Sequence, residues 1–179
     1  MKPAEPAPLR PERQFRAGQP ANGQPNIGQS PGELPHSVFV YGTLMPGESN
    51  AAVAQAAGPP SSQERATLSG YALHDLSPEG YPALTQSEGT QGTGAGHGTV
   101  QGWLLHYSAD QWPAALLHLD DLEGLHLAPP LYTRSLTRAT TASGLQTVWV
   151  YLYARLERLE QPGCAAVPSG DWTSVTGRP

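Results

Sequence analysis

Glu123 is the residue whose place in the sequence most directly indicates chemistry. The segment 112–123 has the apolar spacing of a helix, and at about 100° per residue Leu116, Leu119 and Glu123 fall on one line. Glu123 therefore stands in the middle of the apolar stripe that should face the core. Gly124 follows it directly and is typical of a residue that ends a helix. We expect a carboxylate on the buried face of this helix, at its C-terminal end.

A carboxylate in that position is unfavourable unless it has partners or takes up a proton. Burial raises the pKa of a carboxyl group, and the negative end of the helix dipole acts in the same direction. These conditions let a glutamate exchange protons near neutral pH, as a general acid or base must. The alternative is that Glu123 pairs with a buried arginine, for which Arg134 is available.

The stretch Val38–Leu44 is the second candidate element. Its β-branched and aromatic residues predict a buried strand, which stops at Gly42 and Thr43. Glycine permits a tight loop whose backbone can approach a ligand closely. On the residues alone, the simpler interpretation is an ordinary strand-ending turn at Gly42 and a half-buried sheet aromatic at Tyr41.

The bulk properties exclude several classes of function. The 179 residues carry a formal net charge of -5, with a pI near 5.6, so the chain lacks the basic surface that binds nucleic acid or anionic membranes. The only lysine is Lys2, which excludes a P-loop and Schiff-base catalysis. A single cysteine, Cys164, excludes a multi-cysteine metal cluster, and the histidines lack zinc-ligand spacing. We expect a cytoplasmic protein without a metal, a signal peptide or a membrane span.

Residues 1–35 and 36–179 differ in composition. The first segment is rich in Pro, Gln, Gly and Asn and shows neither helical nor strand periodicity. The segment has too few apolar side chains for their burial to offset the loss of conformational entropy on folding. We therefore expect a disordered tail. The tail would either bind a protein partner or be dispensable. One folded domain is expected at 36–179.

The elements predicted within 36–179 are mostly strands. Strands are expected at Ser37–Tyr41, Ala66–Leu73, Tyr81–Thr85, Thr99–Tyr107, Leu131–Arg138 and Leu145–Ala154. Helices are expected at Asn50–Ala57 and Trp112–Glu123. Because strands and helices do not alternate regularly, the order favours an α+β fold: a small mixed β-barrel or curved sheet with flanking helices.

Four motifs, in this order, resemble those of the gamma-glutamylcyclotransferase-like family. They read VFVYGTL at Val38–Leu44, LDDLEG at Leu119–Gly124, YTR at Tyr132–Arg134 and GDW at Gly170–Trp172. The last is similar to the closing motif of bacterial relatives, and together the four span nearly the whole folded region. The resemblance implies the mixed barrel of that family and identifies Glu123 as its catalytic glutamate.

The resemblance also implies a reaction, an internal aminolysis of a small γ-glutamyl substrate without a cofactor. The α-amine attacks the γ-carbonyl of the same glutamyl group, which forms 5-oxoproline and releases an amine, while Glu123 transfers the proton. Backbone N–H donors for the substrate carboxylate or the oxyanion would come from the loop of Tyr41, Gly42, Thr43 and Leu44. Tyr132 would contact the substrate, and Arg134 would orient Glu123 or a neighbouring carboxylate.

Two other functions stay open at this stage. One keeps the scaffold and changes the acceptor or leaving group, as in a γ-glutamyl deacylase of a specialised pathway. The other is a non-catalytic module that binds a small molecule and uses the tail for partner contacts. A solvent-exposed Glu123, or one ion-paired far from the loop 41–44, would remove the main support for an enzyme.

Overall fold

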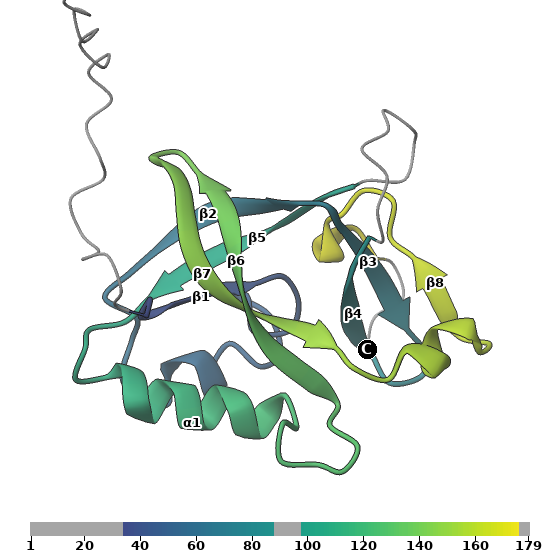
Figure 1. Ribbon diagram of the computed structural model, residues 1–179, viewed down its shortest axis with the longest axis horizontal. Coiled ribbons are helices and arrows are strands. Elements are labelled where there is room, and N and C mark those ends of the chain that lie inside the picture. Colours follow the sequence, from purple (N-terminus) through teal and green to yellow (C-terminus); the bar gives the residue numbers. More distant parts are fainter. Residues whose placement is uncertain (1–33, 88–97, 176–179) are drawn as a thin grey trace, which may run out of the picture.

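Five strands close into a mixed β-barrel, which forms the main body of the molecule (Figure 1). The computed structural model describes residues 34–87 and 98–175. In spatial order the barrel strands are β1 (Ser37–Val40), β5 (Thr99–His106), β2 (Ser62–Ser69), β6 (Tyr132–Thr141) and β7 (Gly144–Tyr153). The α+β barrel expected from the sequence is confirmed. The predicted tail, residues 1–35, lies almost entirely outside the described residues.

Strand β1 leads into the candidate loop and is buried along its whole length. None of its four residues has more than 2% of its surface exposed. It pairs antiparallel with β5 and parallel with β7, so that Phe39 lies opposite both Leu104 and Val150. A strand covered on both faces carries a continuous apolar run, which explains the sequence of this segment. The loop at 41–44 therefore starts from a rigid point in the core.

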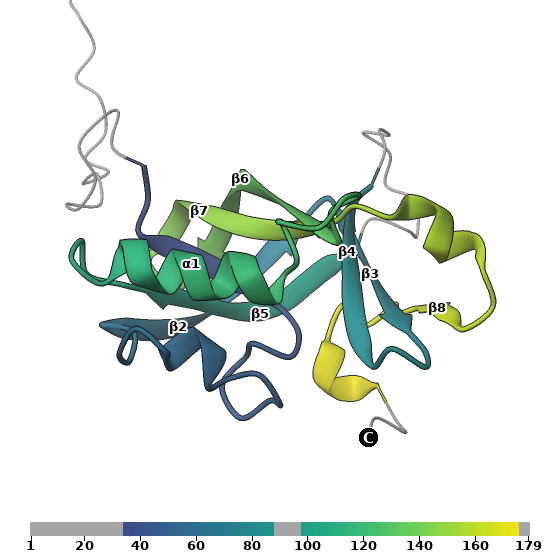
Figure 2. The same cartoon turned by 90° about the horizontal axis from the view of Figure 1, so that it is seen from below.

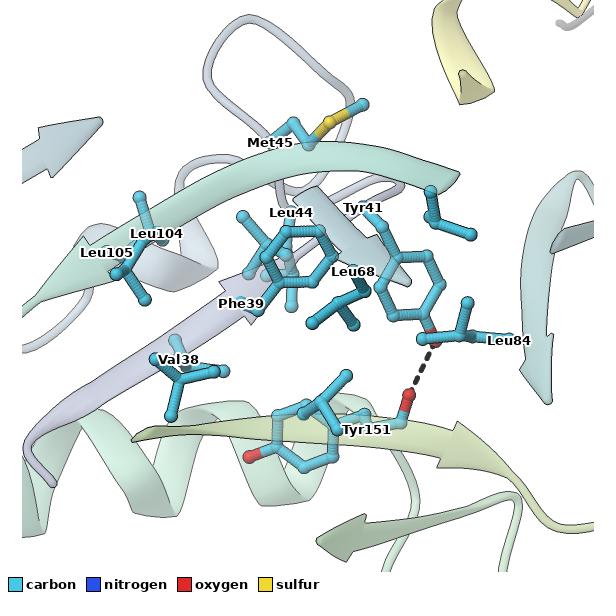
Figure 3. Packing of buried hydrophobic residues seen from close by; sticks show 14 of the residues in the cluster. Val38, Phe39, Tyr41, Leu44, Met45, Leu68, Leu84, Leu104, Leu105 and Tyr151 are labelled. Atoms are coloured by element: carbon cyan, nitrogen blue, oxygen red, sulfur yellow. Dashed lines mark hydrogen bonds between the residues drawn. The ribbon is translucent and has the colours of Figure 1, made fainter. Parts of the chain in front are cut away.

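The contact between β1 and β5 is closest at Gly102. A Cβ atom at this position would lie 2.3 Å from the carbonyl oxygen of Val40 and 2.6 Å from the ring of Phe39. The Phe39 ring itself lies among the apolar side chains of the core, beside Leu44 and Leu68 (Figure 3). Only a residue without a side chain fits between these two strands.

A smaller sheet lies beside the barrel (Figures 1 and 2). Its order is β4 (Tyr81–Gln86), β3 (Tyr71–Leu76) and β8 (Cys164–Ala166). The single strand predicted at 66–73 is wrong, because β2 ends at Ser69 and β3 begins at Tyr71. Gly70, with φ of +85°, turns the chain between them in a conformation that favours glycine. Strand β4 contacts β7 and so brings its first residues next to the barrel.

The helix predicted at 112–123 is confirmed as α1 (Trp112–Leu122), which lies along one side of the barrel (Figure 2). Leu119 on its inner face is fully buried. The helix ends at Glu123, and Gly124 follows with φ of +62°, as its sequence position predicted. An added Cβ at Gly124 would also lie 2.9 Å from the side chain of Leu127. The positive φ therefore favours glycine after Glu123, whereas the exposed end of the Leu127 side chain could move aside.

The second predicted helix, at 50–57, is wrong. Only a 3₁₀ turn, η1 (Val53–Gln55), forms there, and it contacts α1. A segment of this length gains too few helical hydrogen bonds to offset nucleation. The N–H of Asn50 instead donates to the carbonyl of Thr43 at 2.8 Å, which ties the segment to the candidate loop.

Two further 3₁₀ turns are η2 (Leu156–Glu160) and η3 (Trp172–Ser174). No helix in the described ranges is long and apolar enough to cross a membrane.

We predict that Gly102→Ala destabilises the protein, because the new methyl group meets the Val40 carbonyl and the Phe39 ring. The free energy of unfolding should fall by about 1–3 kcal/mol, the usual effect of overpacking a core. Urea denaturation followed by tryptophan fluorescence measures the change. Gly98→Ala is the matched control, since its Cβ would lie an ordinary 3.8 Å from the nearest atom. An unchanged unfolding midpoint in Gly102→Ala would contradict the close contact.

Candidate active site

One pocket joins the end of β1, the end of α1 and the first residues of β4 and β6. It is an open cavity of about 620 Å³, part of which is solvent at the mouth. The lining residues are Phe39, Val40, Tyr41, Gly42, Thr43, Leu44, Asn50, Tyr81, Pro82, Leu122, Glu123, Leu131, Tyr132 and Tyr151. All six residues predicted from the sequence as catalytic or substrate-binding therefore lie around the same cavity.

Glu123 lines this pocket and is partly buried. Burial, and secondarily the negative charge of Asp120, raises the pKa of its carboxyl group to about 8. Among residues 34–87 and 98–175, no group donates a hydrogen bond to this carboxyl. The carboxyl group is thus poised to take up and release a proton near neutral pH.

Arg134 does not pair with Glu123, so the alternative considered for the sequence is wrong. Its guanidinium binds Asp120 instead, with Nη1 donating to Oδ1 at 2.6 Å. The hydroxyl of Tyr151 donates to the same Oδ1, also at 2.6 Å. The guanidinium lies over the ring of Trp149, 4.9 Å from its centroid. Asp120 therefore anchors the end of α1 to β6 and β7, which fixes the position of Glu123.

The hydroxyl of Tyr41 also binds strand β7. It donates to the carbonyl oxygen of Tyr151 at 2.7 Å, the bond drawn as a dashed line in Figure 3. Burial, followed by the charge of Glu123, raises the pKa of Tyr41 well above its usual value, so the hydroxyl stays protonated. Tyr41 thus links the candidate loop to the strand that holds Asp120.

The loop after β1 lines the pocket and carries backbone N–H donors. In the described part of the chain, nothing accepts a hydrogen bond from the N–H groups of Gly42, Thr43 or Leu44. The loop is braced by Asn50, whose Nδ2 donates to Oγ1 of Thr43 at 3.1 Å. Successive free N–H groups of this kind favour an anion such as a carboxylate or an oxyanion.

Gly42 has a packing role that the sequence did not reveal. A Cβ atom there would lie 2.2 Å from Cγ of Pro82 on β4. The absence of a side chain therefore lets β4 approach the loop, and that side of Gly42 is occupied by protein. The carbonyl of Pro82 accepts the hydrogen bond of the Tyr132 hydroxyl. Gly42 and Tyr132, both predicted to touch substrate, thus also hold the two walls together around Pro82.

Several pocket residues were missed by reasoning from the sequence. Asn50 was placed in a helix that does not form, and Tyr81 and Pro82 lie at the start of a strand with no motif of their own. Asp120, which does not line the pocket but anchors the helix that carries Glu123, was also not singled out, although it belongs to the LDDLEG motif. Its spacing of three residues from Glu123, together with the nearby Arg134, was the signal that could have identified it.

Comparison of the sequence with known proteins identifies one family. The family model described as gamma-glutamyl cyclotransferase, AIG2-like, matches residues 38–174. A Vibrio cholerae protein provisionally named a gamma-glutamylcyclotransferase is 34% identical over 139 residues, which is 78% of this chain and 96% of that protein.

Solved structures show the same fold at lower sequence identity. The crystal structure of an AIG2-like protein from Mus musculus aligns with a TM-score of 0.50 and 22% identity, over 71% of this chain and 84% of that one. The crystal structure of YkqA from Bacillus subtilis aligns with a TM-score of 0.50 and 19% identity, over 76% of this chain and 39% of that one. These likenesses concern the fold.

We predict that Glu123→Gln stabilises the protein above pH 4.5. The folded pKa of Glu123, about 8, lies above the ordinary value of 4.5. Below pH 4.5 the carboxyl is protonated in both the folded and the unfolded chain, and stability does not suffer from it. As the pH rises from 4.5 toward 8, the unfolded chain ionises first, so the free energy of unfolding falls progressively. Glutamine stays neutral, so the variant should gain about 3 °C or more in Tm at pH 8.5.

Thermal unfolding at pH 4, 6 and 8.5 checks the sign of this effect. The difference in Tm between the variant and the wild type should grow with pH. Asp121→Asn is the matched control, because Asp121 is an exposed carboxylate on the same helix. A constant difference across the three pH values would contradict a raised pKa for Glu123.

Proposed function

Because this chain belongs to the gamma-glutamyl cyclotransferase, AIG2-like family, we propose that it converts a small γ-glutamyl amine or peptide into 5-oxoproline and a free amine. Glu123 is the general acid and base of the proposed reaction. The observation that carries the proposal is the state of this partly buried carboxyl group. Among the described residues no group donates a hydrogen bond to it, and it shares the pocket with three backbone N–H groups that lack an acceptor there.

The proposed reaction begins with proton transfer from the substrate. Glu123 accepts a proton from the α-ammonium group, and the resulting amine attacks the γ-carbonyl carbon of the same glutamyl unit. A C–N bond forms, and the carbonyl oxygen becomes an oxyanion. Glu123 then gives the proton to the leaving nitrogen as the original C–N bond breaks. The carboxylate is thereby regenerated, and no nucleophile of the protein is consumed.

The pocket contributes mainly by positioning the substrate. The N–H groups of Gly42, Thr43 and Leu44 would bind the substrate carboxylate or the oxyanion, and Tyr132 with Tyr41 would shape the walls around it. The bound carboxylate would hold the chain in the folded conformation that ring closure requires. Such restriction is a large part of the rate gain in an intramolecular reaction.

We predict that Glu123→Gln lowers the rate of 5-oxoproline formation by at least roughly 100-fold, since the amide cannot accept the proton. The full-length protein is incubated with a panel of γ-glutamyl compounds, and 5-oxoproline is measured by mass spectrometry. Asp121→Asn removes a carboxylate from the exposed face of the same helix and should retain activity. Undiminished product from Glu123→Gln would remove Glu123 from the mechanism.

The same assay separates the competing functions. Glutamate in place of 5-oxoproline would indicate a γ-glutamyl deacylase, because water rather than the α-amine would then attack the carbonyl. Binding of γ-glutamyl compounds without any product would indicate a non-catalytic module. Either result would overturn the proposed cyclisation.

We predict a bell-shaped dependence of kcat/KM on pH, with its maximum near pH 8. The rising limb follows ionisation of the Glu123 carboxyl in the free enzyme, and the falling limb follows loss of the proton from the substrate α-ammonium group. Asp120→Asn should move the midpoint of the rising limb to lower pH, because it removes the negative charge that contributes to the raised pKa of Glu123. Asparagine can still accept the bonds from Arg134 and Tyr151 through its amide oxygen. A pH–rate profile from pH 5 to 9.5 measures both effects. If Asp121→Asn moved the midpoint of the pH–rate profile as far as Asp120→Asn does, the specific influence of Asp120 on the pKa of Glu123 would be contradicted.

A further inference from the structure

Asn50 lines the pocket and binds the candidate loop through two separate hydrogen bonds. Its backbone N–H donates to the carbonyl of Thr43 at 2.8 Å, and its side-chain Nδ2 donates to Oγ1 of the same residue at 3.1 Å. The chain between these two residues is tightened further, because the N–H of Met45 donates to the carbonyl of Gly42 at 2.9 Å. Thr43 is therefore held in a fixed position at the pocket.

The side-chain bond restricts where the hydroxyl proton of Thr43 can point. The amide nitrogen of Asn50 donates and has no lone pair to offer, so the hydroxyl cannot donate back to it. In the described part of the chain, no other group accepts this proton. Thr43 lines the pocket and is only half-buried, so the proton is left for a group that binds there.

The hydroxyl adds a fourth donor to the N–H groups of Gly42, Thr43 and Leu44. A carboxylate offers about four lone-pair positions on its two oxygens, whereas an oxyanion has a single oxygen. Four donors on three consecutive residues thus suit a carboxylate better than an oxyanion. A carboxylate is charged before, during and after the reaction, so a donor that is already oriented in the free protein strengthens its binding from the start.

We propose that Asn50 is a positioning residue, which turns the hydroxyl of Thr43 toward the α-carboxylate of the substrate. This inference rests on the proposed function and adds to it a residue that the proton transfer does not use. Asn50 acts through Thr43, because its amide occupies an acceptor position of Oγ1 and leaves the proton for the substrate. Loss of this effect should weaken substrate binding and leave the chemical step largely unchanged.

Asn50→Asp tests the direction of the bond, because it keeps the shape of the side chain. An ionised aspartate only accepts, so the hydroxyl of Thr43 would donate to it and be lost to the substrate. With γ-glutamyl-alanine, followed through 5-oxoproline, KM should rise at least about tenfold, the effect of one charge-assisted hydrogen bond. The value of kcat should change less than about twofold. Gln55→Glu, the same change at an exposed amide of the same segment, is the matched control and should leave KM unchanged.

Two variants of Thr43 separate the hydroxyl from the charge that Asn50→Asp adds. Thr43→Val removes the hydroxyl at a similar volume and should raise KM about tenfold, whereas Thr43→Ser keeps a hydroxyl and should raise it less. In the Thr43→Val protein, Asn50→Asp should raise KM by a smaller factor than in the wild type, because no hydroxyl proton remains to be redirected. Thr43→Val also tests the inference if Asn50→Asp fails to fold.

A wild-type KM in Asn50→Asp would reduce Asn50 to a brace of the loop and overturn the inference, since aspartate preserves the brace. A fall in kcat at constant KM, or an equal effect of Asn50→Asp with and without the Thr43 hydroxyl, would also overturn it. All three results leave the proposed function intact.

If no γ-glutamyl compound gave 5-oxoproline, the proposed function would fail by itself. The affinity for γ-glutamyl-alanine is then measured by calorimetry. Weaker binding to both Asn50→Asp and Thr43→Val than to Gln55→Glu would support the inference. Equal affinities, or no binding to the wild type, would overturn it.

Discussion

The unequal environments of two carboxylates on one helical turn determine the character of this site. Asp120 and Glu123 are three residues apart and so lie on neighbouring parts of the helix surface. Arg134 and the hydroxyl of Tyr151 both bind Asp120, and neither binds Glu123. Asp120 is thereby anchored, and its negative charge adds to the effect of burial on the pKa of Glu123. One carboxylate holds the helix in place, and the other is left free to titrate.

The walls of the pocket are joined by tyrosine hydroxyls that donate to backbone carbonyls. Tyr41 binds the carbonyl of Tyr151, and Tyr132 binds that of Pro82, which itself fills the space beside Gly42. Each bond links an element of the barrel either to another barrel strand or to the small sheet. A buried tyrosine combines a large apolar surface with a polar end that needs a partner, so it suits this role. The cavity is therefore part of the packed structure rather than a gap between loops.

The sequence indicated the site where a residue did not suit its surroundings. A glutamate on an apolar stripe and a buried strand interrupted by Gly42 both pointed to the pocket, and both lie in it. The Asp120–Arg134 pair was not deducible in the same way, because it joins a helix to a strand and depends on how the two pack. The role of Gly42 was likewise hidden, since Pro82 comes from another sheet. Asn50 was misplaced because alanine-rich composition favoured a helix, whereas a tertiary hydrogen bond to Thr43 determines the local structure.

A raised pKa at Glu123 suits the proposed chemistry because one group must both accept and donate the proton. An ordinary glutamate, with a pKa near 4.5, would take a proton from an ammonium group only in a strongly uphill step. Free α-amino groups have pKa values near 8, and the pKa of Glu123 is raised to about the same value. Transfer between the two is then nearly balanced in free energy, so Glu123 can take up the proton and can also release it again. The burial that makes an ionised Glu123 unfavourable for the fold is thus the same feature that would match its pKa to the proposed substrate.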